Sequence, residues 1–176
     1  MRVLCGHDAD VAEWVAARIP HVESDGFGKC VGVGVVGQTG SLMAGVVFHD
    51  YQPACGTVQL SCAADTPKWA SRKIVRAILH VPFMQYACNK VWTATPHQNE
   101  RAIKFNKGIG FRPEATLRHQ FGPKQHAVIC SMLRSEYLRE YGSDDVAPGA
   151  AFADGFNGRP INAEFAREAA VGSARV

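Results

Sequence analysis

The sequence has no apolar run long enough to cross a lipid bilayer, which argues against a helical membrane protein. Its first residues turn acidic at Asp8, too early for a secretory signal peptide. No C-x-x-C pair occurs and the seven histidines are scattered, so the ligand spacing of a zinc site is missing. Lys and Arg exceed Asp and Glu only by 19 to 16, which is too little for a dedicated nucleic-acid coat.

The composition is that of a folded domain. Apolar residues make up 47% of the 176 residues and charged residues 20%, which excludes global disorder. Most of the six cysteines lie inside apolar, strand-like runs, where they are expected to act as small buried hydrophobes. Such usage is typical of a reducing compartment, and we expect a cytoplasmic protein without a metal centre.

Hydrophobic periodicity predicts alternating strands and helices. An early helix opens at Asp8 or Asp10 and ends before Pro20. A second helix follows Ser71 and is ended or kinked by Pro82, because proline lacks an N–H. Strands are expected at 2–5, 30–36, 42–49, 56–63, 91–95, 116–121 and 126–133, with a third helix at 99–107. The unit spanning 56–95 is a β-α-β crossover, so its two strands should be parallel.

The composition changes after Tyr141. Residues 142–176 are rich in Gly and Ala and poor in large aliphatic side chains. We therefore expect one domain over 1–141 and a C-terminal tail over 142–176. The tail is either flexible or docked on the domain or on a second copy, with one short helix around 162–170.

Two local motifs allow different interpretations. Gly32 to Gly37 spells G-x-G-x-x-G, but a turn and a strand follow it, whereas a dinucleotide site needs a helix there. A glycine-rich strand that lets another element approach its backbone is the alternative. His49-Asp50-Tyr51 ends a strand with three titratable groups, which suit either a catalytic base or the start of a surface turn.

A basic cluster surrounds a loop-to-helix junction. Lys68, Arg72 and Lys73 lie beside Ser71, a potential helix N-cap. A helix N-terminus presents unpaired N–H groups and the positive end of the dipole, so it attracts phosphate. A solvated basic surface is the alternative explanation.

The segment from Asn99 to Glu114 carries the most specific pattern. Asn99, Ala102-Ile103, Gly110-Phe111 and Glu114 fit N-x-x-[AS]-I-x-x-x-x-x-x-G-F-x-x-E, which resembles the GCN5-related N-acetyltransferases, the GNAT superfamily. Leu117-Arg118 and 131–136 look like the end of its ribosomal-protein-type and phage-encoded branches. The element order is also similar over about three-quarters of the chain. The resemblance implies an α/β (α+β) fold with a mixed, mostly antiparallel sheet, a central splayed parallel pair and flanking helices.

The same resemblance implies acetyl-CoA, or another acyl-CoA, bound between the splayed strands. Pantetheine would bond to the first strand, and the pyrophosphate would lie at the start of the next helix. The residues implied in cofactor binding are Leu60, Ser61, Cys62, Ala63, Lys68, Trp69, Ala70, Ser71, Arg72, Lys73, Asn99 and Asn106. Two departures stand out. The phosphate loop has no glycine, so Trp69 must point away from the phosphates, and Asn106 occupies the place of a common tyrosine acid.

The implied reaction is direct attack of an amine on the thioester. A backbone N–H near Ser61 or Cys62 would stabilise the oxyanion, and holding both reactants in one cleft would supply most of the acceleration. His49 and Glu114 are the candidate bases, and Asn106 is a candidate orienting group. Cys62 is better explained as a core residue than as a covalent relay.

Other functions remain open at this stage. A domain that has lost its glycine loop and tyrosine would serve as a binding or CoA-sensing module. A third interpretation is modification of a nucleic-acid base. The partners expected are an acyl-CoA and an amine acceptor, with no membrane and with a homodimer compatible with the sequence.

Overall fold

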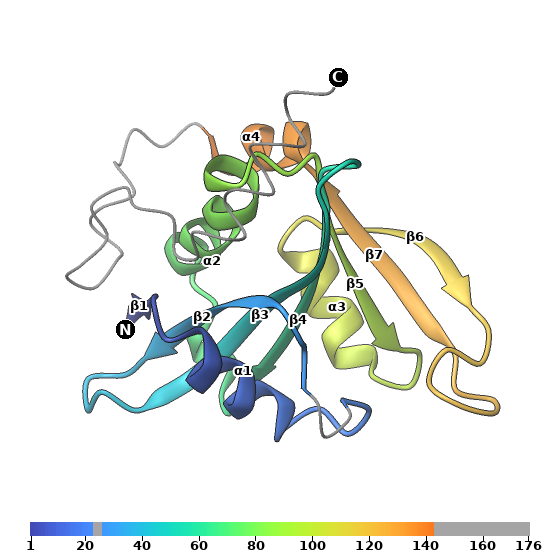
Figure 1. Ribbon diagram of the computed structural model, residues 1–176, viewed down its shortest axis with the longest axis horizontal. Helices are drawn as coiled ribbons and strands as arrows, with labels where there is room; N and C mark the ends of the chain where they lie inside the picture. The colour runs from blue at the N-terminus through green and yellow to red at the C-terminus, as the bar shows by residue number, and fades with distance from the viewer. Residues whose placement is uncertain (23–25, 143–176) are drawn as a thin grey trace.

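The computed structural model describes residues 1–22 and 26–142, which form one sheet with helices on both faces (Figure 1). The strands are β1 (Arg2–Leu4), β2 (Cys30–Val36), β3 (Leu42–Gln52), β4 (Thr57–Ala64), β5 (Lys90–Pro96), β6 (Arg112–Leu117) and β7 (Ala127–Leu133). The helices are α1 (Asp8–Ala16), α2 (Arg72–His80), α3 (Glu100–Gly108) and α4 (Arg134–Tyr141), with a 3-10 turn η1 (Pro67–Trp69) and a π turn η2 (Val81–Gln85).

The sheet has the order β1-β2-β3-β4-β5-β7-β6, and only β4 and β5 are parallel. This confirms the expected mixed, mostly antiparallel α/β fold. The parallel ladder is short, running from Thr57 opposite Lys90 to Gln59 opposite Trp92. Beyond that point β4 pairs only with β3, and β5 pairs only with β7, within the described residues. The expected splay is therefore present.

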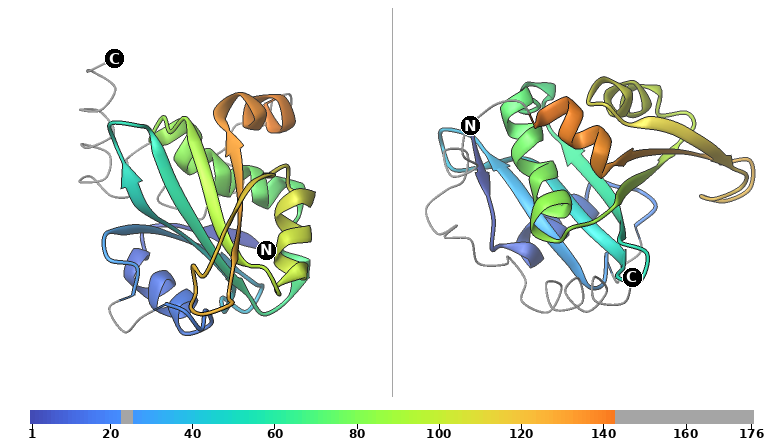
Figure 2. Two further views of the ribbon diagram at one scale, coloured as in Figure 1. Left: turned by 90° about the vertical axis from the view of Figure 1, so that its right-hand side faces the viewer. Right: turned by 90° about the horizontal axis from the view of Figure 1, so that it is seen from above.

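Each face of the sheet has its own helices (Figure 2). Val11 and Val15 of α1 pack with Val47 on one face. The other face carries the larger core, in which valines of β2 and β3 meet Leu79 of α2 and Phe83 of η2. Helix α4 joins that side through Tyr137, whose ring stacks on Phe83 with centroids 5.0 Å apart. Alternation along each strand thus decides which helix a side chain meets.

The glycines of the G-x-G-x-x-G run are where α1 approaches the sheet. A Cβ on Gly32 would lie 2.9 Å from the Val11 Cβ, and one on Gly34 would lie 3.3 Å from a Val11 methyl. On the neighbouring strand, a Cβ on Gly45 would come within 2.5 Å of a Val15 methyl. The Gly32 N–H also donates to the Asp8 carboxylate at 2.9 Å. The glycine-rich strand therefore lets α1 pack closely against its backbone, which confirms the second interpretation of the motif.

The structure corrects several element boundaries. The strand expected at 116–121 is wrong, because β6 spans Arg112–Leu117 and a loop with positive φ at His119, Gly122 and Lys124 follows it. The end or kink expected at Pro82 is present, because α2 ends at His80 and the π turn η2 follows it. Helix α4 was not predicted, although Tyr137 and Tyr141 have helical spacing and Glu136 accepts a hydrogen bond from the Leu133 N–H at 3.0 Å.

All six cysteines are free thiols. No helix over the described ranges is both long and apolar enough to cross a membrane. The expected tail beyond 142, with its short helix around 162–170, lies outside the described residues.

Close packing of α1 predicts that Gly45→Ala destabilises the protein. The new methyl group would overlap Val15, so we expect a loss of about 1–3 kcal/mol in the free energy of unfolding. Urea denaturation measures this. Gly108→Ala is the matched control, because nothing lies within 4 Å of its Cβ position, and its stability should be unchanged or slightly higher. A Gly45→Ala protein as stable as the wild type would contradict the packing account.

Candidate active site

The candidate site is the gap where β4 and β5 diverge. On the α2 and α3 side this gap opens into an apolar pocket lined by Val46, Leu60, Cys62, Trp69, Val75, Ile78, Leu79, Phe105, Asn106, Ile109 and Phe111. Leu60 and Cys62 point into the pocket, so Ser61 and Ala63 face the α1 side of the sheet. The segment from Leu60 to Ala64 has no strand partner on the side of β5 among the described residues. Its backbone edge can therefore bond to an extended ligand.

The N-terminus of α2 lies at the next step of the chain. Ser71 caps it by accepting from the Ile74 N–H at 3.4 Å, and the following first-turn N–H groups have no acceptor within the helix. Lys68, Ser71 and Lys73 are exposed there, while Ala70 is half-buried. An anion at this point would meet two flexible ammonium groups and the positive end of the helix dipole.

Arg72 is held elsewhere. Its guanidinium donates to the Glu140 carboxylate at 2.8 Å and to the Glu140 carbonyl, and it lies 4.9 Å over the Tyr141 ring. These contacts join the start of α2 to the end of α4. Of the three cations in the sequence cluster, Arg72 is the one with a structural role in this structure.

Trp69 points inward. It is 5% exposed, and its ring centroid lies 5.6 Å from that of Phe105 on α3. The side chain therefore forms a wall of the apolar pocket and leaves the exposed junction to Lys68 and Lys73.

Both asparagines of the motif have structural hydrogen bonds. The Asn99 side chain accepts from the Ala102 N–H at 3.1 Å and so caps α3. Asn106 is buried, and its amide nitrogen donates to the hydroxyls of Thr93 and Thr95, each at 3.2 Å. Asn106 thus fastens α3 to the part of β5 that has diverged from β4.

Glu114 lies away from the other candidates. Its carboxylate accepts from Lys90 at 2.5 Å and from the Ser131 hydroxyl at 2.6 Å, near the paired end of β5. The Lys90 hydrogen bond, followed by that of Ser131, lowers the pKa of Glu114. Its strand is four strand spacings from β3, so roughly 19 Å separates it from His49. The structure does not bring these two candidate bases together.

His49 is a candidate base whose two ring nitrogens both have polar partners. Its Nε2 lies 2.9 Å from the Ser61 Oγ, and its Nδ1 lies 2.9 Å from an Asp50 carboxylate oxygen. The residue is 7% exposed, and its ring is tilted by 42° against that of Phe27, with centroids 4.9 Å apart. Burial lowers the pKa of His49, although the Asp50 charge opposes this effect. The imidazole is therefore neutral at neutral pH.

Cys62 is a poor nucleophile by comparison. Burial raises the pKa of its thiol to about 12, so the thiolate is scarce at neutral pH. This favours the interpretation of Cys62 as a core residue.

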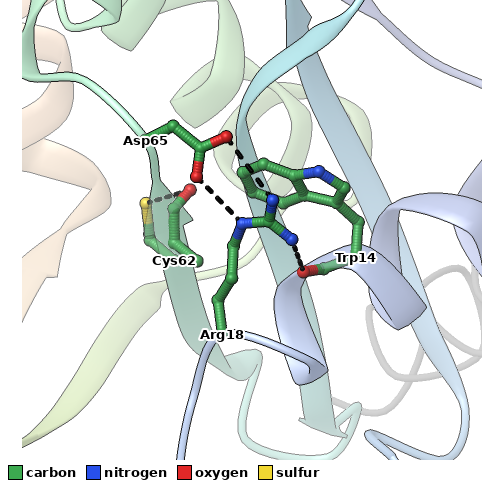
Figure 3. Close-up of polar contacts among 5 residues, drawn as sticks. Trp14, Arg18, Cys62 and Asp65 are labelled. Carbon is green, nitrogen blue, oxygen red and sulfur yellow. Dashed lines mark hydrogen bonds and ion pairs between the residues drawn. The ribbon is translucent and has the colours of Figure 1, made fainter.

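An ion pair joins Asp65, just after β4, to Arg18, just after α1 (Figure 3). Arg18 donates through Nε to one Asp65 oxygen at 3.0 Å and through Nη2 to the other at 3.4 Å. Its guanidinium also lies 3.6 Å over the Trp14 ring and donates to the Trp14 carbonyl at 3.1 Å. The Arg18–Asp65 ion pair thus lies at the open end of the gap, on the β4 side.

The loop between β6 and β7 reaches across the same end of the fold. Phe121 contacts His21, which follows α1, with ring centroids 4.1 Å apart. His126 lies against His97 and His119, with centroids 5.1 and 5.3 Å away. No group of three or more His, Cys, Asp or Glu side chains in 1–22 and 26–142 is arranged to hold a metal ion.

Sequence reasoning missed the partners of these candidates. Asp50 was noted but given no role, and Ser61 was chosen for its backbone alone. Thr93 and Thr95 were not considered. Their alternation along β5 was the available signal, because two threonines on a buried face need a hydrogen-bond partner.

Comparison with known proteins gives the fold. No family model and no curated protein sequence matches the chain. Among solved structures, a point mutant of spermidine N-acetyltransferase SpeG from Vibrio cholerae aligns with a TM-score of 0.63 at 14% identity, over 77% of this chain and 95% of that one. The same enzyme in complex with CoA and spermine aligns with a TM-score of 0.55 at 18% identity, over 63% and 69%. The chain has the GNAT fold. Within this fold the diverging strands are β4 and β5, as the sequence resemblance implied.

The contacts of Asn106 predict a stability role. Asn106→Leu keeps the side-chain size but leaves two buried hydroxyls without their donor, so we expect a loss of about 1–3 kcal/mol. Thermal and urea unfolding measure it. Lys104→Ala, on the exposed face of the same helix, should change stability by less than about 0.5 kcal/mol. Equal stabilities of the two variants would mean that Asn106 does not fasten α3 to β5.

Proposed function

We propose that this protein is an acyl-CoA-dependent N-acyltransferase, with acetyl-CoA as the preferred donor. The observation that carries the proposal is the divergence of β4 from β5 beyond Gln59 and Trp92, which leaves a strand edge beside an apolar pocket. An extended ligand with amide groups, such as pantetheine, matches both features. Helix α2, with its capped N-terminus, starts where the pyrophosphate of that ligand would need an anion site.

The cofactor contacts follow from this placement. Backbone groups of Leu60 to Ala63 would bond to the pantetheine amides, and Leu60 and Cys62 would contact its apolar atoms. The pyrophosphate would meet the first turn of α2 with Lys68 and Lys73. Arg72 would have to leave Glu140 to take part, so we place it outside the phosphate site. Asn99 and Asn106 would act by holding α3 in place.

In the proposed reaction a neutral amine attacks the thioester carbonyl directly. The amine nitrogen bonds to the acyl carbon, the C–S bond breaks, and CoA leaves as a thiolate that solvent protonates. The substrate amine arrives as an ammonium ion, so a base must remove its proton. His49 fits that role, because burial keeps its ring neutral and Ser61 connects it to the gap. A backbone N–H near Ser61 or Cys62 would stabilise the oxyanion.

A small amine is the first acceptor to test. One solved neighbour of this fold is described as a spermidine N-acetyltransferase in complex with CoA and spermine. The sequence patterns 117–118 and 131–136 also lead us to propose a relationship to the ribosomal-protein-type and phage-encoded branches. Six free thiols suit the cytoplasm, which we propose as its location. A homodimer or larger assembly is part of the proposal, since one neighbour is described as dodecameric.

The experiment combines cofactor binding with acetyl transfer. Acetyl-CoA at about 100 times its Kd should raise the free energy of unfolding by roughly 2.7 kcal/mol, which a thermal-shift assay detects. CoA release should then depend on an added amine such as spermidine. Replacing Lys68 and Lys73 by Ala should weaken binding at least about tenfold in calorimetry. The control replaces Arg118 and Lys124, which are exposed in the loop between β6 and β7, and should bind as the wild type does.

The outcomes distinguish an acyltransferase from a CoA-sensing binding module. Binding without release of CoA across amines, peptides and nucleic acids would favour the CoA-sensing module. No binding at millimolar acetyl-CoA would contradict the proposed function.

A further inference from the structure

We propose that, when no amine is bound, Ser61 itself accepts the acyl group, so that the site forms an acyl-serine and hydrolyses thioesters. The observation is a chain of three side chains, Ser61–His49–Asp50, joined by two contacts of 2.9 Å. A hydroxyl, an imidazole and a carboxylate in this order form an activated nucleophile. The inference rests on the proposed function only for its donor, an acyl thioester bound in the gap.

The hydrogen-bond pattern fixes the tautomer of His49. A carboxylate can only accept, so the contact with Asp50 places the ring proton on Nδ1. The lone pair of Nε2 is then directed at Ser61 and accepts from its hydroxyl. This is the tautomer that a general base for a serine nucleophile requires.

The backbone at Asp50 is distorted in a way that produces this contact. Adjacent residues of a regular strand point to opposite faces, so Asp50 should lie across the sheet from His49. Here the pairing of β3 with β4 shifts register between His49 and Gln52, and Asp50 has φ +50°, a conformation that few side chains other than Asp and Asn adopt. Unusual backbone conformations of this kind concentrate at functional sites.

Ser61 is placed to meet the donor. It is the second residue of β4 beyond the last pair with β5, inside the segment whose edge would hold pantetheine. Its side chain is partly exposed, whereas His49 behind it is shielded by Phe27. Nucleophilic catalysis needs this arrangement, in which the base is shielded from water and the nucleophile is accessible to the donor.

The proposed step balances as follows. Ser61 Oγ bonds to the thioester carbonyl carbon while its proton moves to His49 Nε2. The C–S bond then breaks, and the thiolate takes the proton from the imidazolium to leave as CoA thiol. Water attacks the acyl-serine, gives its proton to His49, and Ser61 leaves with that proton as the free hydroxyl. Asp50 holds the ring and stabilises its positive charge throughout.

The test is direct detection of the acyl-enzyme. Full-length protein is mixed with acetyl-CoA, or with p-nitrophenyl acetate as a donor that needs no CoA site, and is quenched rapidly in acid. Peptide mass spectrometry should find one acetyl group on the peptide that contains Ser61. A burst of p-nitrophenol should match the amount of enzyme.

Variants separate chemistry from folding. Ser61→Ala should lose the acetylated peptide and the burst, and Ser61→Cys should restore acylation through its thiol. Asp50→Asn should slow acylation by about tenfold or more, because the ring loses its orienting charge. Ser41→Ala, in the turn before β3, is the matched control and should acylate as the wild type does.

The outcomes are distinguishable from failure of the proposed function. Acylation of Ser61 by p-nitrophenyl acetate, but not by acetyl-CoA, supports the nucleophile and contradicts the CoA site. Amine acetylation from acetyl-CoA with neither a burst nor an acyl-serine keeps direct transfer and overturns the inference. Absence of all three signals overturns it as well, as does acylation that persists unchanged in Ser61→Ala.

Discussion

The structure depends on one constraint: β4 and β5 stay parallel and paired for only three residue pairs. Beyond these pairs the two strands are bonded to different neighbours, β4 to β3 and β5 to β7. Asn106 fastens the far end of β5 to α3, and the Arg18–Asp65 ion pair fastens the end of β4 to α1 (Figure 3). The gap between them therefore follows from the strand pairing, with these side-chain contacts at its two sides.

The divergence divides the site into two sides with different chemistry. Leu60 and Cys62 face the apolar pocket under α2 and α3, while Ser61 faces His49 on the α1 side. Strand alternation alone produces this division. Under the proposed function, a donor that enters through the pocket would present its acyl carbon beside the His49 imidazole and the Ser61 hydroxyl.

The sequence predicted the order of strands and helices well because hydrophobic alternation is a local signal, while the divergence of the parallel pair was implied by the resemblance to the GNAT superfamily. Gly32 is an example, since the glycine-rich strand was expected to let another element approach, and α1 packs there. The hydrogen-bond partners of the candidate site residues were harder to predict, because they depend on the register between strands that are distant in the sequence. His49 meets Ser61 only because His49 pairs with Gln59, and Glu114 is separated from both by the order of β5 and β7. Arg72 was expected to bind phosphate because it is a cation at the start of α2. Its actual partner, Glu140, lies on α4, a helix that was not predicted.

Amide hydrogen exchange with and without CoA tests the central claim most directly. If the gap binds the cofactor along β4, the amides of Leu60 to Ala64 that are not bonded to β3 should exchange rapidly alone and slowly with saturating CoA. The amides of Val31 to Val35, inside the sheet, are the reference and should not change. CoA that binds without protecting Leu60 to Ala64 would contradict the account, because the strand edge would then not be its site.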